Sequence, residues 1–328
     1  MRDGPPNLHF HVARPLTAPL PRVFQAVRIC SARATLRTSQ MYKAFFGLIS
    51  NPFNLSPDPA FLYRSPHHEE ALANLVYGVQ SRKGFILLTG EVGTGKTTML
   101  ECLRDHLDSH QIPFAFIFNS RLTADQFFEM IAYDLDLPCT RTSKTEVLIA
   151  LNTILLERAN QNKTTVLIVD EGQNLDWDVL EEIRLLGNLE NRRGKLLQII
   201  ISGQPELDEK LERDEYRQLR QRIALRCRLR PFSDSETTAY IATRLGIAGL
   251  RDQNVFPPNV LARIHKGTGG IPRLINSVCD NLLLTSFAMA RPVVTAEMYD
   301  EVARDLRLES ARPDSGRPNR SGMHIAGN

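Results

Sequence analysis

The feature that most constrains the fold of this 328-residue chain is the glycine-rich stretch G-E-V-G-T-G-K-T at residues 90–97. It matches G-x-x-x-x-G-K-[ST] at every fixed position, between a strand-like run, Phe85–Thr89, and a helical run, Thr98–Leu107. Its backbone N–H groups and the helix N-terminus face an anion. We therefore predict a phosphate loop, in which Lys96 contacts the β- and γ-phosphates and Thr97 binds Mg²⁺. The residues expected to bind nucleotide are Gly90, Glu91, Val92, Gly93, Thr94, Gly95, Lys96, Thr97 and Thr98.

A second motif follows the apolar run Val166–Val169, where Asp170 and Glu171 come in succession. The carboxyl ends of parallel strands face one crevice, so these carboxylates are expected beside the phosphate loop. Asp170 is predicted to hold Mg²⁺ from its outer shell, and Glu171 to polarise the attacking water as general base. The two motifs together predict hydrolysis of ATP with Mg²⁺.

Five short apolar runs alternate with amphipathic helices from residue 84 to residue 231. Their near-continuous apolar character is typical of parallel strands that are buried on both faces. The fifth run carries arginines and is expected at an edge of the sheet. The pattern predicts an α/β fold of the P-loop NTPase class, a three-layer parallel sheet followed by an all-helical lid. The predicted strands are Phe85–Thr89, Phe114–Phe118, Val166–Asp170, Leu196–Ser202 and Leu225–Arg230.

The strand pattern stops at Pro231, and four helical runs follow it. We predict an α/β ATPase domain over residues 41–231 and a helical lid over 232–308, with a tail at 309–328. Residues 1–40 hold five prolines and no sustained pattern, and are expected to be an unstructured extension. A transit peptide and a start at Met41 are the alternatives for this segment.

Charge and composition exclude several classes of protein. The net charge is +3, but residues 1–40 hold six arginines against one aspartate, so the remainder is near neutral and does not indicate nucleic-acid binding. Five scattered cysteines without a C-x-x-C pattern favour a reducing cytoplasm over disulfides or zinc. Mean hydropathy is −0.23, and no uncharged apolar run approaches the ~18 residues that a membrane helix needs.

Six blocks of sequence resemble one family over residues 41–308. They are Y-x-x-F-F-G-L-x-x-N-P-F-x-L-S-P-D-P-x-F-L-Y from Tyr42, the phosphate loop, D-E-x-Q-N-L from Asp170, G-Q-P-E-L from Gly203, L-R-Q-R-I from Leu219 and G-G-I-P-R-L-I-N from Gly269. These blocks resemble the AAA+ ATPases of the general secretion pathway protein A type, the cytoplasmic ATPase module of type II secretion. The resemblance implies a homo-oligomer, joined through its ATP sites, that drives or regulates envelope secretion machinery.

The resemblance also implies a location and partners. It places the chain in the cytoplasm or at the inner membrane's periphery, with secretion-system inner-membrane proteins as partners. Related transposition regulators share the core blocks, so an ATP-dependent DNA-binding regulator is the alternative, and so is a non-hydrolysing nucleotide switch. A basic cluster at Arg192, Arg193 and Lys195 is expected in a loop, either solvated or in contact with DNA. The sequence departs from the family at Gly172, where alanine is common, and lacks the membrane segment and peptidoglycan-binding domain of larger members.

Roles for further residues come from the resemblance alone. Gln204 corresponds to the polar sensor beside the γ-phosphate, with Ser202 as its alternative. Arg222 corresponds to an arginine finger that is supplied to a neighbouring subunit, and Arg220 is the next candidate. Both arginines are expected on a helical stretch, Arg213–Ile223.

Residues in the predicted lid, and in the segment that precedes the first predicted strand, also match functional positions of the family. Arg273, which follows G-G-I-P at a helix start, corresponds to the second sensor that contacts the γ-phosphate from the lid. Phe61, Leu62 and His68 resemble the segment that packs on adenine, although a structural role for His68 is the alternative.

Overall fold

The computed structural model describes residues 42–55, 61, 63–118, 121–138, 143–192, 194–250 and 253–308. The predictions for residues 1–40 and 309–328, and those that involve Leu62 and Arg193, lie outside the described residues. None of the helices in the described part is long and apolar enough to cross a membrane.

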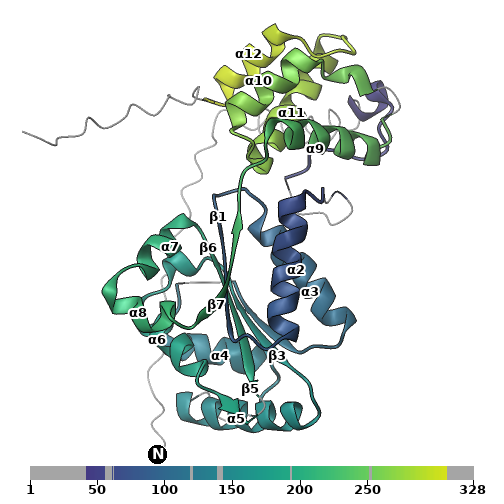
Figure 1. Ribbon diagram of the computed structural model, residues 1–328. Coiled ribbons are helices and arrows are strands. Elements are labelled where there is room, and N and C mark those ends of the chain that lie inside the picture. Colours follow the sequence, from purple (N-terminus) through teal and green to yellow (C-terminus); the bar gives the residue numbers. More distant parts are fainter. Residues whose placement is uncertain are drawn as a thin grey trace, which may run out of the picture.

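A five-stranded parallel sheet organises the larger part of the molecule, in the order β2-β3-β6-β1-β7 (Figure 1). Every residue of the three central strands is buried, as their continuous apolar runs predict. β7 lies at one edge, in agreement with its arginines, and β2 lies at the other. The strands are β1 (Phe85–Gly90), β2 (Phe114–Ile117), β3 (Thr165–Val169), β6 (Leu197–Gly203) and β7 (Ile223–Leu229).

Helices cover both faces of this sheet, which makes three layers (Figure 1). Successive residues of a strand point to opposite faces, so Ile86 and Leu88 pack under α2 and α3, whereas Phe85 and Leu87 pack under the helices of the other face. One face carries α2 (Pro66–Gln80) and α3 (Lys96–Ser109). The other carries α4 (Ala124–Asp134), α5 (Lys144–Asn160), α6 (Trp177–Leu186), α7 (Pro205–Leu211) and α8 (Arg217–Arg220).

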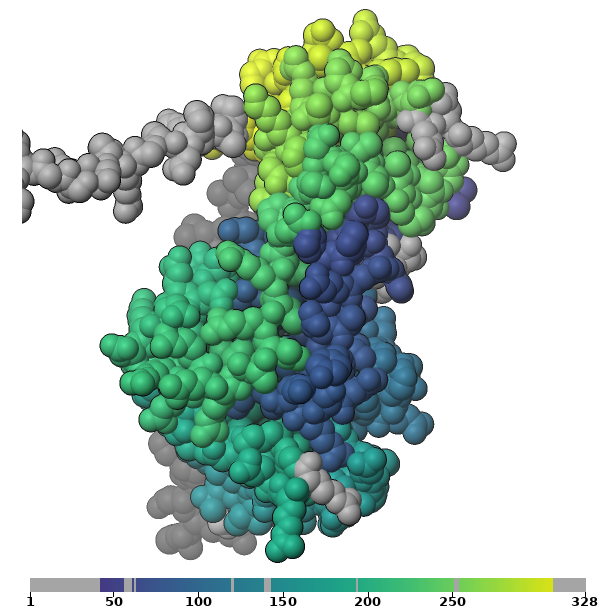
Figure 2. Space-filling view, in the orientation of Figure 1, coloured from purple at the N-terminus to yellow at the C-terminus, as the bar shows by residue number. Residues whose placement is uncertain are grey.

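A helical unit stands beyond the carboxyl end of β7 (Figures 1 and 2). Its core also takes in Tyr42, Leu48, Phe53 and Phe61, from the start of the described chain, where residues 42–46 are helical. The described residues 42–55 and 61 therefore pack with this unit, although the sequence boundary assigned them to the α/β part. The unit's helices are α9 (Asp234–Ile247), α10 (Pro258–Thr268), α11 (Pro272–Ala288) and α12 (Ala296–Asp305).

Two local predictions need correction. Of the basic cluster, Lys195 lies in the two-stranded ribbon that Glu190–Asn191 (β4) and Gly194–Lys195 (β5) form, whereas Arg192 lies in the turn that follows β4. The stretch 213–223 is not one helix. It consists of a 3₁₀ turn at Asp214–Tyr216, the short α8 and, from Ile223, strand β7.

The outer edge of β2 has a side-chain hydrogen bond in place of a sixth strand. The backbone N–H of Phe116 donates to Oδ2 of Asp134 at 2.7 Å. Asp134 is the last residue of α4, which packs beside β2. The helix therefore supplies an acceptor to a strand edge on which no strand of the described residues pairs.

Candidate nucleotide-binding site

The phosphate loop joins the carboxyl end of β1 to the N-terminus of α3. Gly93 has φ +82° and Gly95 has φ +102°, a left-handed conformation that glycine adopts without strain. A Cβ at Gly93 would approach the Cβ of Arg273 to 2.8 Å, so this glycine also permits close contact with the helical unit. The loop and the first turn of α3 line a cavity of about 550 Å³.

The cavity has two ends of different character. We call one the phosphate-loop end, which is lined by Val92–Thr98 together with Glu171, Gln204 and Arg273. We call the other the aromatic end. It is lined by Phe61, Tyr63, His68, Phe232 and Tyr240, with Asn54, Leu55, Arg244 and Asn276.

Lys96 lies at the phosphate-loop end with a buried side chain. Its Nζ donates to the carbonyl oxygens of Gly90 at 2.7 Å and Glu91 at 3.1 Å. Burial lowers the pKa of Lys96, while the nearby carboxylates of Glu171 and Asp170 raise it. Neutral carbonyls compensate a buried ammonium weakly, so the arrangement favours an anion beside Nζ.

Asp170 and Glu171 follow β3 directly, as the sequence predicts for a strand end. Asp170 is buried, and its Oδ1 accepts the backbone N–H of Glu171 at 2.9 Å. Burial raises the pKa of Asp170, and the hydrogen bond from Glu171 opposes that rise. Glu171 has φ +54°, which is costly for a residue with a side chain and typical of functional positions. Its side chain reaches the cavity.

Two glutamine side chains hold the Glu171 carboxylate. The Nε2 of Gln173 donates to Oε2 of Glu171 at 2.5 Å, and the Nε2 of Gln204 donates to the same oxygen at 3.3 Å. The Gln204 backbone N–H donates to Oε1 of Gln173 at 3.0 Å, which closes the cluster. Gln204 thus lies beside the catalytic candidate. Gln173 had no assigned role, although it stands inside the D-E-x-Q-N-L block that carries the resemblance.

Ser202, the alternative to Gln204, lies on β6 and is fully buried. Its hydroxyl has no hydrogen-bond partner of ordinary geometry among the described residues, although it is near enough to Asp170 to lower that carboxyl's pKa. Ser202 does not line the cavity, whereas Gln204 does. The geometry therefore favours Gln204 as the sensor.

Gly172 packs closely against β6 and α7. A Cβ at this position would lie 2.7 Å from Cγ2 of Ile201 and 3.1 Å from Cδ2 of Leu207. Both contacts are with apolar side chains of a packed layer, so an alanine needs local repacking. This explains why glycine suits the position in this chain, where the family commonly has alanine.

Arg273 connects the helical unit to the phosphate loop. Its backbone N–H donates to the carbonyl oxygen of Gly93 at 3.3 Å, and its exposed side chain lines the cavity. The residue is the second of α11, which begins with Pro272 as its predicted first-turn proline. Arg273 therefore lies where the sequence placed it, at a helix start beside the phosphate loop.

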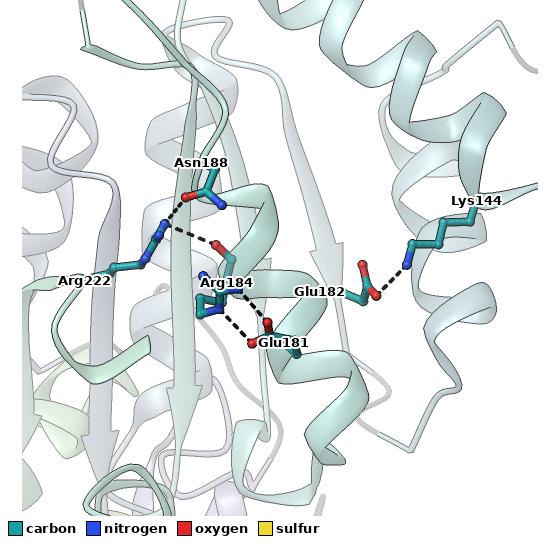
Figure 3. Close-up of polar contacts among 6 residues, drawn as sticks. All are labelled: Lys144, Glu181, Glu182, Arg184, Asn188 and Arg222. Carbon is teal, nitrogen blue, oxygen red and sulfur yellow. Dashed lines mark hydrogen bonds and ion pairs between the residues drawn. The ribbon is translucent and has the colours of Figure 1, made fainter. Parts of the chain in front are cut away.

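Arg222 lies far from the cavity of its own chain. It directly precedes β7, whose first residue, Ile223, pairs with Phe85 at the amino end of β1. The phosphate loop follows the opposite end of β1, one strand of about 20 Å away. Figure 3 shows the Arg222 guanidinium at the carboxyl end of α6, where it donates to Oδ1 of Asn188 and to the carbonyl oxygen of Arg184. Arg220 instead pairs with Glu212 at 2.6 Å.

Two further ion pairs involve helix α6, one within the helix and one with α5 (Figure 3). Arg184 forms a two-pronged hydrogen bond with Glu181 on its own helix, at 2.7 and 2.6 Å. Lys144 of α5 pairs with Glu182 at 2.5 Å. The hydrogen bond from Arg184 lowers the pKa of the half-buried Glu181. The carboxylates of Glu181 and Glu182 are thus paired with Arg184 and Lys144, and among the described residues Arg222 donates only to neutral oxygens at the end of α6.

His68 bridges α2 and the phosphate loop. Its Nδ1 lies 2.7 Å from the hydroxyl oxygen of Ser65, and its Nε2 lies 3.0 Å from the carbonyl oxygen of Thr94. A carbonyl only accepts, so Nε2 carries the proton and the neutral ring satisfies both contacts. Burial lowers the pKa of His68, which favours this neutral form. The structural alternative for His68 is therefore the better supported one, alongside its place in the cavity wall.

The oxygen donors at the phosphate-loop end fit Mg²⁺. This ion takes hard oxygen ligands, commonly one or two carboxylates with substrate phosphates and waters. The exposed Thr97 hydroxyl lies one residue from Lys96, and the Asp170 carboxylate is close enough to raise the Lys96 pKa. The described residues contain no cluster of three or more His, Cys, Asp or Glu side chains suited to a metal. A metal here would thus depend on the nucleotide's phosphates.

Comparisons with known proteins agree with this geometry. Residues 79–211 match the model of an AAA domain family. General secretion pathway protein A of Aeromonas hydrophila is 45% identical over 249 residues, which cover 76% of this chain and 45% of that protein. The chain thus spans under half the length of this relative.

Solved structures show the same fold at low identity. Cdc6p of Pyrobaculum aerophilum has a TM-score of 0.60 at 19% identity, covering 79% of this chain and 71% of that one. The Drosophila ORC bound to DNA has a TM-score of 0.56 at 17% identity, and the match covers 92% of this chain and 71% of that one. ORC1 of Aeropyrum pernix in complex with DNA has a TM-score of 0.54 at 19% identity, and the match covers 78% of this chain and 69% of that one. The predicted fold class and family resemblance are confirmed: residues 79–211 match an AAA domain, the fold is that of the AAA+ P-loop NTPases, and the chain is a homologue of general secretion pathway protein A.

Proposed function

We propose that this chain binds ATP with Mg²⁺ in the cavity and hydrolyses it. The observation that carries the proposal is that Glu171 reaches the same cavity as the phosphate loop, in a strained backbone conformation and under two glutamine side chains. A loop that only bound phosphate would not need a carboxylate held in this way. This also argues against a non-hydrolysing switch.

The residues divide the work between binding and proton transfer. Phosphates placed on the loop displace the backbone carbonyls from Lys96, whose ammonium then binds the β- and γ-phosphate oxygens. Water attacks the γ-phosphorus, and Glu171 accepts its proton as the bond to the ADP oxygen breaks. Gln173 and Gln204 orient the Glu171 carboxylate. Mg²⁺, held through Thr97 and Asp170, supplies positive charge to the phosphate oxygens when bound.

The proposal includes assembly through the ATP site. Arg222 stands at the end of β1 opposite the phosphate loop, so it serves a neighbouring subunit's site rather than its own. Arg273 acts from the helical unit, which works as a lid because its α11 begins against the loop. Loss of the γ-phosphate then removes a charge contact to Arg273 and biases the lid toward rotation.

The work of the ATPase is proposed to serve a secretion-type assembly of the cell envelope, from the cytoplasm. This rests on the homologue's name and on its 45% identity over 249 residues of this chain. The DNA-binding alternative rests on the basic ribbon, but Lys195 of β5 is paired with Glu190 of β4 at 2.5 Å. That pairing removes part of the charge that DNA phosphates would need.

Two substitutions test the proposal. Lys96→Ala removes the phosphate contact, so ATP affinity should fall by at least about tenfold, the value of one charge-assisted hydrogen bond. Glu171→Gln keeps the shape and removes the base, so affinity should persist while turnover falls about 10²–10⁴-fold. Calorimetric titration with ATP and Mg²⁺, together with phosphate release, measures both. Equal ATP affinity in wild type and Lys96→Ala would overturn the site assignment.

A further inference from the structure

Arg244 is a buried cation at the aromatic end of the cavity, and the hydrolytic chemistry does not use it. It lies on α9 with a side chain that is 7% exposed. Burying a guanidinium is costly unless it is paired or fully hydrogen-bonded. Among the described residues no carboxylate lies within ion-pair distance of it, so neutral acceptors hold the charge.

Two of these acceptors belong to the chain segment that precedes α2. The Nε of Arg244 donates to the carbonyl oxygen of Pro52 at 2.5 Å, and Nη1 donates to that of Phe61 at 3.4 Å. The guanidinium carbon also lies 5.1 Å from the centre of the Phe61 ring. One side chain therefore fixes the segment at two points that stand nine residues apart in the sequence.

The third acceptor belongs to α9 itself and leads to α11. Nη1 of Arg244 donates to the Tyr240 hydroxyl at 3.0 Å, and that hydroxyl donates to Oδ1 of Asn276 at 2.8 Å. Tyr240, in turn, packs against Phe232 and Tyr63 with ring centres 5.1 and 5.8 Å apart. The guanidinium thus joins the N-terminal segment, α9 and α11, and all three contribute to the aromatic end.

We propose that Arg244 is a positioning residue for the nucleoside part of the ligand, because its guanidinium bridges α9 to Pro52 and Phe61 and so assembles the aromatic end of the cavity. This inference rests on the proposed function and deepens it. The phosphates bind to a loop that Arg244 does not contact, so their affinity is independent of it. Base recognition, in contrast, depends on the bridge.

The test compares a ligand with a base against one without, in the full chain. Binding of ADP and of inorganic tripolyphosphate, each with Mg²⁺, is measured by calorimetric titration for wild type and Arg244→Met. ADP affinity should fall about tenfold or more, since hydrogen bonds to a charged group are each worth about that factor. Tripolyphosphate affinity should stay within about twofold of the wild-type value. An equal loss for both ligands would overturn the inference, because Arg244 would then act as an attracting charge.

Two further arginine variants control for charge and for the helical unit as a whole. Arg244→Lys keeps the charge but lacks the planar fork that reaches three acceptors, so most of the ADP loss should remain. If lysine restores ADP affinity, charge alone matters and the bridge is refuted. Arg263→Met removes an exposed guanidinium of the same unit, which pairs with Asp300 at 2.5 Å, and should change neither ligand.

A milder variant keeps the inference testable where Arg244→Met does not fold. Tyr240→Phe removes only the hydroxyl between Arg244 and Asn276 and should reduce ADP affinity severalfold while sparing tripolyphosphate. No change in ADP affinity would contradict the bridge. Failure of wild type to bind either ligand would refute the proposed function itself, which is a different outcome from a ligand-independent effect of Arg244.

Discussion

The phosphate-loop end of the cavity is built mainly from seven consecutive residues, Val92–Thr98, whereas the aromatic end joins Arg244 to Phe61 across 183 positions of sequence. Turn geometry and a helix terminus define the first end, and both follow from local sequence. The second exists only when an N-terminal segment, α9 and α11 pack together. The contrast separates a proposed phosphate site, formed mainly by one loop, from a proposed base-recognition surface that depends on the position of the helical unit.

The largest expected effect concerns Arg222, which is proposed to complete the phosphate-loop end of a neighbouring subunit. Arg222→Ala should leave ATP affinity nearly unchanged and reduce turnover about 10³–10⁵-fold, the range known for arginine fingers. Phosphate release per subunit, measured against protein concentration, should also rise with concentration in wild type. In that case one subunit supplies all the residues that bind the phosphates, whereas catalysis also needs Arg222 of a neighbouring subunit.

A mixture of two inactive variants decides whether Arg222 acts in trans. Arg222→Ala combined with Glu171→Gln should regain part of the activity, because some interfaces then hold an intact Glu171 and an intact Arg222. Co-assembly is verified by size-exclusion chromatography with ATP. A co-assembled but inactive mixture contradicts the assignment, and Arg220 then becomes the candidate.

A smaller effect is expected where the two parts of the molecule touch. Gly93→Ala forces a side chain into φ +82° and brings its Cβ to 2.8 Å from that of Arg273. Backbone strain of this kind costs about 1–3 kcal/mol, so affinity for both ADP and tripolyphosphate should fall about tenfold. Gly246→Ala, in α9, adds a Cβ that meets nothing within 4 Å and serves as the matched control. Loss of ADP binding alone in Gly93→Ala would break the proposed division between the two ends.

The smallest effect is a pH dependence at His68, which touches both ends. Its pKa is lowered in the folded protein, so between that value and the ordinary pKa near 6.5 the unfolded chain binds more protons. Stability from this residue is therefore present above pH 6.5 and is lost as the pH falls below it. Urea unfolding at pH 5 and pH 7 should show a smaller pH difference in His68→Gln than in wild type. Identical differences would show that His68 is not titrating in this window.

The sequence predicted features that depend on neighbouring residues and missed contacts between residues that are far apart in the chain. The strands and the phosphate loop follow from runs and motifs within ten residues. Helix starts are equally local: α4 and α9 begin with capping boxes at Thr123 and Ser233, and the Ser143 hydroxyl at the start of α5 accepts the backbone N–H of Glu146. Arg244 and Asn276 carried no such signal, because their partners lie far away in the sequence.

The prediction for 213–223 failed for a physical reason. Its apolar residues Tyr216, Leu219 and Ile223 have helical spacing, but they pack against the sheet from three successive elements. Periodicity over one or two turns cannot distinguish a helix from a turn that leads into an edge strand. The role of Arg222 stays a prediction, since its partner would belong to another subunit.

The carboxylate on the outer edge of β2 has a consequence for solubility at high concentration. An unpaired strand edge is a template for pairing with another chain, and native proteins block such edges with charges. On that edge, Oδ2 of Asp134 already accepts a hydrogen bond from the backbone N–H of Phe116. An incoming strand would have to displace this hydrogen bond and bring its backbone beside a negative charge. If the chain assembles through its ATP sites as proposed, this hydrogen bond opposes a second, unwanted association through the sheet edges.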